Sequence, residues 1–218
     1  MSDLLPVFNN SVAERILAGL SRIALVLRHR GWVDATELGI TPTQGQILTL
    51  LASRLSQPLG VSRIAEELAL TKPTVSDSIS TLVRKELLEK VRSQTDGRAV
   101  ELRLTPKGER LAQGTSAWPE SLQTAAQALS EEERAVFLRG LVKMVRTLQA
   151  QRLIPVTRMC VNCRFFGPHA NSGSGQPHHC AFLNAPIGDA MLQVDCKDFD
   201  AATPARMTEV WTAFKGSE

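Results

Sequence analysis

The sequence predicts a mainly helical protein with one small β-hairpin, followed by an irregular extension that contains all of its cysteines. Three observations support this fold class. Apolar side chains recur at helical spacing through most of residues 11–153, alternating residues flank an Asp-Gly pair at 96–97, and the four cysteines all follow residue 159. Apolar residues make up 43% of the 218 positions, which is enough for a folded core and too much for a disordered chain.

The first predicted helix covers residues 11–30. Its apolar stripe consists of Ile16, Leu17, Leu20, Ile23, Ala24 and Leu27. Asn10 or Ser11 can cap the start of this helix, and a basic last turn suits the negative end of the helix dipole. We therefore expect the helix to end at Gly31.

Three further helices follow, and the last two have the pattern of a helix-turn-helix. Thr41 and Thr71 are expected to cap the first and the third of them, and Ser62 can cap the second. The third helix turns Val75, Ile79, Leu82 and Val83 inward, and its outer face carries Thr74, Ser76, Asp77, Ser78 and Ser80. Short hydrogen-bonding side chains of this kind can reach base edges in a major groove. The alternative is an ordinary polar surface helix.

The hairpin predicted around Asp96-Gly97 comes directly after this candidate recognition helix, which makes it a candidate wing. Arg92 and Arg98 would project near its tip, where a guanidinium can enter a narrow minor groove. Residues 71–110 hold a surplus of three positive charges, as many as the net charge of +3 of the whole chain, although a solvated surface can also have this surplus. The candidate DNA-contacting residues are Lys72, Thr74, Ser76, Asp77, Ser78, Arg84, Lys85, Arg92 and Arg98.

Residues 10–152 resemble the MarR family of winged-helix regulators. The resemblance is carried by TPTQGQILTLL at 41–51, by the helix-turn-helix at 61–90, and by the Asp96-x-Arg98 wing with the closing LTPKG at 104–108. It implies a homodimer whose recognition helices enter successive major grooves of double-stranded, pseudo-palindromic operator DNA. The domains that it implies are an N-terminal dimerisation helix (1–38), a winged helix-turn-helix (39–108) and long dimerisation helices (109–154).

The long helices begin with residues 106–129, where Pro119 predicts a break or kink. Ser130 and Glu133 then form a capping box at the start of the last long helix. Its apolar stripe consists of Ala135, Leu138, Leu141, Val142, Val145 and Leu148. Burial against a second subunit is the favoured interpretation of this stripe, and burial within the same chain is the alternative.

Residues 155–218 form an extension that MarR-like proteins generally lack, with Cys160, Cys163, Cys180 and Cys196 in the pattern C-x2-C-x16-C-x15-C. A structural zinc site usually has two close cysteine pairs, and here only the first pair is close. An iron–sulfur cubane accepts thiolates from separate loops, and apolar residues surround these cysteines. A thiol switch would need only the first pair. The favoured cofactor is therefore a [4Fe–4S] cluster, with zinc as the alternative.

The spacing also resembles that of high-potential iron–sulfur proteins, in which a CxxC is followed by two single cysteines with aromatic residues just after the ligands. The residues expected around the cofactor are His178, His179, Phe166 and Phe182. Asp195 and Asp198 are expected to hydrogen-bond the backbone near Cys196. A helix over 203–215 should dock on the rest of the protein through Met207, Val210, Trp211 and Phe214.

Together these features predict a DNA-binding transcription regulator, rather than an enzyme, whose operator affinity responds to a cluster that senses redox state, oxygen, nitric oxide or iron. One alternative is a MarR-like regulator with structural zinc and a small-molecule pocket. Another is an electron-transfer module on a DNA-binding scaffold. The sequence has neither a signal peptide nor a membrane span, so we expect a cytoplasmic protein without a membrane partner.

Overall fold

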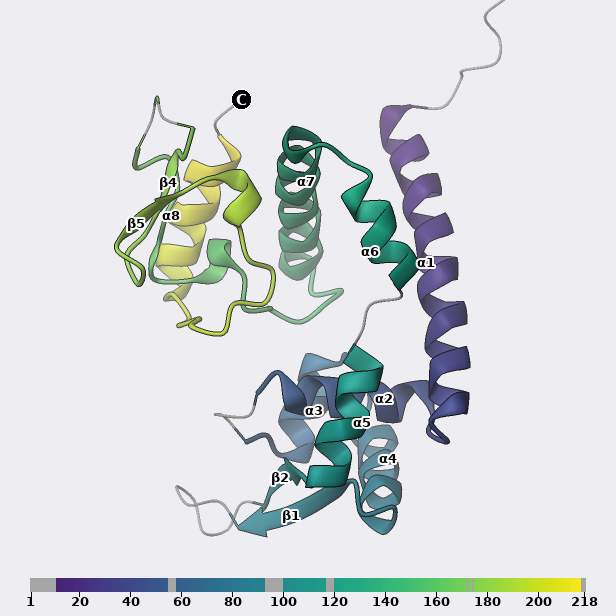
Figure 1. Cartoon of the computed structure of the whole chain (residues 1–218). Helices are drawn as coiled ribbons and strands as arrows, with labels where there is room; N and C mark the ends of the chain where they lie inside the picture. Colours follow the sequence, from purple (N-terminus) through teal and green to yellow (C-terminus); the bar gives the residue numbers. More distant parts are fainter. Residues whose placement is uncertain are drawn as a thin grey trace, which may run out of the picture.

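The computed structural model describes residues 11–54, 58–92, 100–116, 120–171, 173 and 175–216. A winged domain and a cysteine-containing module are joined by long helices (Figure 1). The elements in chain order are α1 (Val12–Glu37), α2 (Pro42–Ala52), α3 (Val61–Glu67), α4 (Lys72–Arg84), β1 (Leu88–Arg92), β2 (Val100–Leu104), α5 (Pro106–Ser116), α6 (Glu120–Gln127), α7 (Glu131–Ala150), η1 (Cys160–Asn162), β3 (Phe166–Gly167), β4 (His178–Cys180), β5 (Ala185–Ile187), η2 (Asp189–Met191) and α8 (Pro204–Lys215).

The winged domain packs α2 to α5 and the β1–β2 hairpin around one apolar core, with Leu48, Ile64 and Ile79 almost fully buried. Thr41 accepts a hydrogen bond from the Gln44 amide at the start of α2, as its predicted role as N-cap requires. Thr71 caps α4 in the same way. The prediction for Ser62 is wrong, because α3 already begins at Val61 and its N-cap is Gly60.

Strands β1 and β2 pair antiparallel, with Lys90 opposite Leu102, which confirms the predicted hairpin. The predicted Asp96-Gly97 turn lies outside the described residues. Gly108 fixes the exit from the hairpin, because a Cβ at this position would lie 2.0 Å from the Leu87 carbonyl oxygen. Only glycine allows this close approach of two backbone segments.

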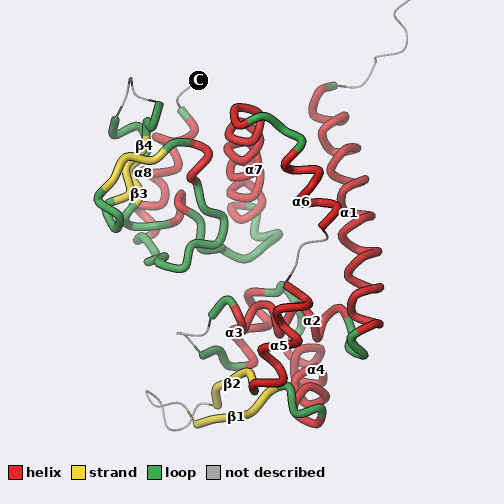
Figure 2. The backbone as a smooth tube through the Cα atoms, in the orientation of Figure 1, coloured by secondary structure: helices red, strands yellow, loops and turns green. Residues whose placement is uncertain are grey.

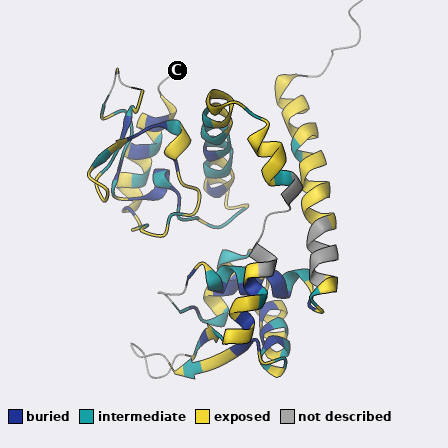
Figure 3. Cartoon of the chain, viewed as in Figure 1, coloured by how far each residue is buried: buried dark blue, intermediate teal, exposed yellow. Residues whose placement is uncertain are grey.

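Helix α1 is 26 residues long and continues past Gly31, where the sequence predicted its end. A glycine costs a helix only about 1 kcal/mol, which the surrounding helical residues outweigh. Ser11 caps its start, since the Glu14 amide donates to the Ser11 hydroxyl. Much of the helix is exposed along its length (Figure 3), and its exposed apolar side chains are Val12, Ile16, Leu17, Ile23, Leu25, Val26 and Leu27.

Helix α5 ends at Ser116 and α6 begins at Glu120, and the break or kink predicted at Pro119 lies outside the described residues. Ser130 and Glu133 form the predicted capping box of α7. The favoured interpretation of the α7 stripe needs correction. Val142 is buried and Leu138 and Val145 are partly buried in the core of the cysteine module, so this part of the stripe is covered by the same chain.

The cysteine module is more regular than the sequence predicted. Strands β3, β4 and β5 form a small antiparallel sheet in that order, seen beside α8 in Figure 2. Its core contains Met159, Val161, Phe166, Val210 and Phe214, and shares no residue with the core of the winged domain. Helix α8 docks through Val210 and Phe214, as predicted, with Thr203 as its N-cap.

Candidate nucleic-acid interface and cysteine site

The outer face of α4 carries the predicted polar side chains. Lys72, Thr74, Ser76 and Asp77 are exposed, and Ser78 is half-buried. The opposite face holds Val75, Ile79 and Leu82 in the core, so their burial fixes which side of the helix faces outward. At the N-terminus of the helix, the Thr74 hydroxyl is 2.7 Å from the hydroxyl of the N-cap residue Thr71.

The basic candidates are divided between the two ends of this surface. Lys72 is at the start of α4, and Arg84 is exposed at its end, where its guanidinium donates to the Thr81 hydroxyl at 3.3 Å. The Lys85 ammonium donates to the Gly39 carbonyl, which ties the end of α4 to the segment after α1. Arg92 is exposed at the end of β1, and Arg98 lies outside the described residues.

The four cysteines come from four places in one module. Cys160 opens η1, Cys163 follows it, Cys180 ends β4, and Cys196 lies in the loop after η2. Local structure brings the first two together, because the Cys163 amide donates to the Cys160 carbonyl at 2.9 Å. The small sheet places Cys180 opposite Phe166, three residues after Cys163. All four thiols are free.

The thiols of Cys160 and Cys196 are those whose ionisation the module perturbs. Burial, together with the coulombic influence of Cys196, Cys163 and Cys180, raises the pKa of the Cys160 thiol to about 11. Burial also raises the pKa of Cys196, with contributions from Cys163 and Cys180. Each thiol of this pair also has a backbone hydrogen bond that lowers its pKa, from Gln193 for Cys160 and from Asp198 for Cys196. Such bonds stabilise a thiolate rather than a thiol.

Among the described residues, however, no three His, Cys, Asp or Glu side chains form a group that could hold a single metal ion. All four thiols nevertheless belong to one module, on η1, after η1, at the end of β4 and in the loop after η2. A zinc ion with bonds of about 2.3 Å gathers its thiolates to within about 4 Å of one another. A cluster binds one thiolate at each iron and therefore spaces them more widely.

The apolar surroundings of the cysteines are only partly those expected. Phe166 and Leu192 are buried, and Phe165 and Phe199 pack partly against the module core. Phe182 is 51% exposed, although its ring lies 5.6 Å from that of Phe165.

The structure places the histidines and corrects one prediction about aspartate. His178 is a fully buried strand residue whose Nε2 lies 3.0 Å from Asp189 Oδ1, and its Nδ1 accepts from the His169 amide. It therefore supports the module core, and His169 packs against its ring. His179 is half-buried in the same strand. Asp195 does not act as a local backbone partner near Cys196 but forms an ion pair with Arg54 of the winged domain.

A buried polar contact joins the cysteine module to α7. The Asn162 amide donates to Gln149 Oε1 at 3.0 Å and to the Thr157 carbonyl at 3.0 Å. Gln149 in turn donates to the Thr157 hydroxyl at 2.8 Å. Asn162 lies between Cys160 and Cys163 in the chain, directly before Cys163. The first cysteine pair is therefore attached to the end of α7 through Gln149. Sequence reasoning did not identify this contact or the role of Arg54, since both depend on tertiary packing.

Comparison with known proteins identifies the helical part of the chain. The family model described as the MarR family matches residues 38–99. The structure of Staphylococcus aureus MepR in its DNA-binding conformation is 30% identical, with a TM-score of 0.55, and the match covers 62% of this chain and 98% of MepR. The chain belongs to the MarR family. A MepR–DNA complex matches at 30% identity and a TM-score of 0.53, over 60% of this chain and 94% of MepR.

A curated relative supports the same assignment. It is an uncharacterised HTH-type transcriptional regulator, YsmB of Bacillus subtilis, which is 29% identical over 126 residues, covering 57% of this chain and 85% of YsmB. This MarR protein is therefore a DNA-binding transcription regulator and not an enzyme. Because about three-fifths of it matches nearly the whole of MepR, the rest has no counterpart there. Among the described residues, no helix is long and apolar enough to cross a membrane.

Proposed function

We propose that this MarR protein is a homodimeric repressor or activator whose operator affinity is set by a [4Fe–4S] cluster on Cys160, Cys163, Cys180 and Cys196. The observation that carries the proposal is that one folded module holds all four thiols, whose neighbours raise the pKa of Cys160 and of Cys196 in addition to burial. Four thiols from separate elements would repel one another once ionised, and a cationic cofactor would offset that repulsion.

The donor set fits a cluster in a second respect. The Gln193 amide donates to Cys160 Sγ at 3.3 Å, and Cys196 also receives a backbone hydrogen bond, from Asp198. Hydrogen bonds to cysteine sulfur are one of the means by which a protein sets the reduction potential of a cluster. When bound, the cluster would supply the change of charge or of integrity by which a signal is sensed.

The DNA-binding side of the proposal rests on α4 and the wing. The exposed Thr74, Ser76 and Asp77 would face base edges in the major groove, and Lys72 would face the phosphate backbone. Two subunits would bind the two halves of a pseudo-palindromic operator, as MepR structures in complex with DNA suggest for the family. The exposed apolar residues of α1 supply surface for the second subunit.

We infer that the module acts on the spacing of the two recognition helices. It packs on α7 through Leu138, Val142 and Val145, and Asn162 donates a hydrogen bond to Gln149 near the end of that helix. A change at the cysteines would shift α7 and, through it, the two DNA-binding halves. Operator affinity falls when their separation no longer matches one turn of DNA.

The test begins with protein purified without oxygen. Iron, acid-labile sulfide and zinc are measured per chain, the visible spectrum is recorded, and the wild type is compared with Cys180→Ser. About four irons and four sulfides per chain, with absorbance near about 400 nm that Cys180→Ser loses, support the cluster. About one zinc per chain in a colourless protein supports the structural-zinc alternative. Protein without metal whose cysteines form disulfides supports the thiol switch.

The sensing role is tested separately from the cofactor. An operator is selected from random DNA, and its affinity for cluster-loaded and cluster-free protein is measured at one salt concentration. A ratio of at least about fivefold supports sensing, because allosteric couplings are typically about 5- to 150-fold. Equal affinity of the two forms would leave an electron-transfer module on a DNA-binding scaffold.

A further inference from the structure

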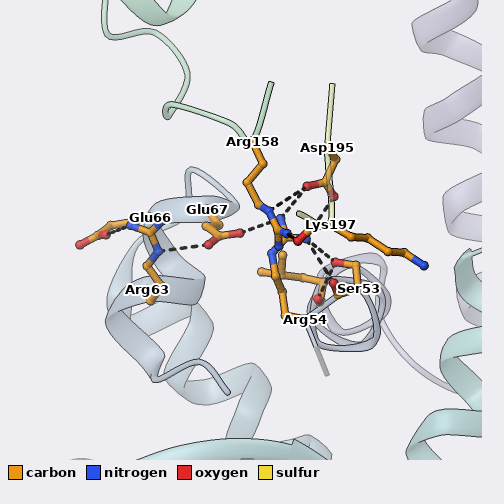
Figure 4. Close-up of polar contacts among 9 residues, drawn as sticks. Ser53, Arg54, Arg63, Glu66, Glu67, Arg158, Asp195 and Lys197 are labelled. Atoms are coloured by element: carbon orange, nitrogen blue, oxygen red, sulfur yellow. Dashed lines mark hydrogen bonds and ion pairs between the residues drawn. The ribbon is translucent and has the colours of Figure 1, made fainter. Parts of the chain in front are cut away.

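Arg54 joins the winged domain directly to the cysteine module. Its guanidinium makes two hydrogen bonds to the Asp195 carboxylate, from Nη2 to Oδ1 at 2.9 Å and from Nη1 to Oδ2 at 3.2 Å (Figure 4). Arg54 follows the last residue of α2 by two positions, whereas Asp195 immediately precedes Cys196. The pair thus connects the base of the DNA-binding domain to one of the four cysteines.

On the side of the winged domain, Arg54 ties two helices together. Its Nη2 also lies 3.3 Å from Glu67 Oε2, at the last residue of α3, and Arg63 pairs with the other oxygen of Glu67 at 3.1 Å. The Arg54 side chain is only 7% exposed. A buried guanidinium needs its partners, because leaving such a charge uncompensated is costly. The ends of α2 and α3, which share one core with α4, are therefore held by the same group.

On the side of the module, Asp195 belongs to a segment that is hydrogen-bonded to the first cysteine. The Cys160 amide donates to the Gln193 carbonyl at 3.1 Å, and the Gln193 amide donates to Cys160 Sγ at 3.3 Å. The Cys196 amide donates to the Arg158 carbonyl at 2.9 Å, and the Arg158 guanidinium donates to the Lys197 carbonyl. Asp195 cannot move independently of Cys160 and Cys196, because the bonded segments lie on both sides of it.

We propose that the Arg54–Asp195 pair transmits the state of the cysteine site to the helix-turn-helix, by a route separate from α7. This inference rests on the proposed function, since it assigns the regulation of that site. A change in how Cys160 and Cys196 are held moves the Asp195 carboxylate. Of its two carboxylate partners, Arg54 then keeps only Glu67, which it shares with Arg63, beside its contact with Ser53. The ends of α2 and α3 are then free to shift together with α4, which packs on them.

The decisive variant is Asp195→Asn, which removes the charge and keeps the size of the side chain. Asp195 is 48% exposed, so the fold should tolerate this change. Its matched control is Asp200→Asn, at a side chain that is 52% exposed and pairs with Arg164 at 3.1 Å inside the module. Asp195→Asn removes the partner of Arg158, at 3.9 Å within the module, just as Asp200→Asn removes the partner of Arg164, but only the first also breaks the bridge to the winged domain.

Three properties are measured for wild type, Asp195→Asn and Asp200→Asn: iron and sulfide content, the ratio of operator affinities with and without cluster, and hydrogen exchange at residues 47–54 and 61–67. We expect all three proteins to hold the cluster. Asp195→Asn should lower the affinity ratio at least about fivefold towards one and speed exchange in both segments. Asp200→Asn should match the wild type in both.

The possible failures can be told apart. If the wild type holds no cluster, the proposed function is wrong whatever the variants do, and the metal analysis shows it. If the wild type holds a cluster and its affinity ratio exceeds one, but Asp195→Asn gives the same ratio and exchange as Asp200→Asn, the Arg54–Asp195 route is wrong and the proposed function stands. A wild-type ratio of one removes sensing and this route together.

Discussion

Replacing Phe214 with alanine should unfold the cysteine module while leaving the winged domain folded. The Phe214 ring is fully buried and lies 6.0 Å from the ring of Phe166, 5.5 Å from that of His178 and 6.3 Å from that of Trp211. Truncation of a buried phenylalanine to alanine costs about 3–5 kcal/mol. Because the two cores share no residue, this loss falls on the module.

The matched control is Phe182→Ala in the same module. Phe182 is 51% exposed and its ring contacts Phe165 at 5.6 Å, so its truncation should cost less than about 1.5 kcal/mol. In a domain of this size, 3 kcal/mol corresponds to a fall in Tm of about 12–24 °C. Cluster-free protein is unfolded by heat, and hydrogen exchange at residues 204–215 and 42–52 follows the two cores separately.

Either of two results would contradict this prediction. If Phe214→Ala and Phe182→Ala lower the stability of the module equally, burial of Phe214 is not what holds the module together. If Phe214→Ala speeds exchange in α2 as much as in α8, the two cores unfold as one unit. A module that is intact in Phe182→Ala and open in Phe214→Ala, beside an unchanged α2, supports the structure.

Three further predictions concern other parts of the chain. Ser76→Ala should weaken specific operator binding by about 1 kcal/mol without changing binding to random DNA, whereas Lys72→Ala should weaken binding to both DNAs and lower the slope of log affinity against log salt concentration by about 1. Fluorescence anisotropy measures the affinity of each variant for both DNAs, and an equal effect of Ser76→Ala on the two would contradict the role of Ser76. Gly108→Ala should destabilise the winged domain by about 1–3 kcal/mol in urea unfolding, because its Cβ would meet the Leu87 carbonyl, whereas Gly175→Ala, with open space around it, should have little effect. In cluster-free protein, iodoacetamide should modify Cys160 far more slowly at pH 8 than it does in urea, because a thiol with a pKa of about 11 is protonated there, and the rate should rise as the pH approaches 11. Equal rates in both conditions would show that burial does not raise this pKa.

The sequence predicted those features of the fold that depend on short-range patterns. Thr41, Thr71 and Ser130 cap their helices as expected, because the cap and the amide that it accepts from are three residues apart. The hairpin follows from alternation on either side of one turn. Gly31 failed as a stop signal, since a local preference of about 1 kcal/mol does not decide where a long helix ends.

Features set by tertiary packing were outside the reach of these patterns. Arg54 and Asp195 are 141 positions apart, and nothing in the residues around either one indicates its partner. The α7 stripe was recognised as apolar, but its periodicity does not state whether the same chain or a second subunit covers it. The four cysteines were identified by spacing alone, whereas the hydrogen bonds that join Cys160 to the loop before Cys196 appear only in the folded module.

If the exposed apolar side chains of α1 join two subunits, the stability of the fold depends on the concentration of the protein in the cell. Ile16, Leu17 and Ile23 are each more than 40% exposed and belong to neither core. For a dimer joined through this helix, each tenfold dilution lowers the free energy of unfolding per dimer by about 1.4 kcal/mol. A regulator that represses its own synthesis would thus lose stability as well as occupancy when it became scarce, and the two losses would reinforce each other.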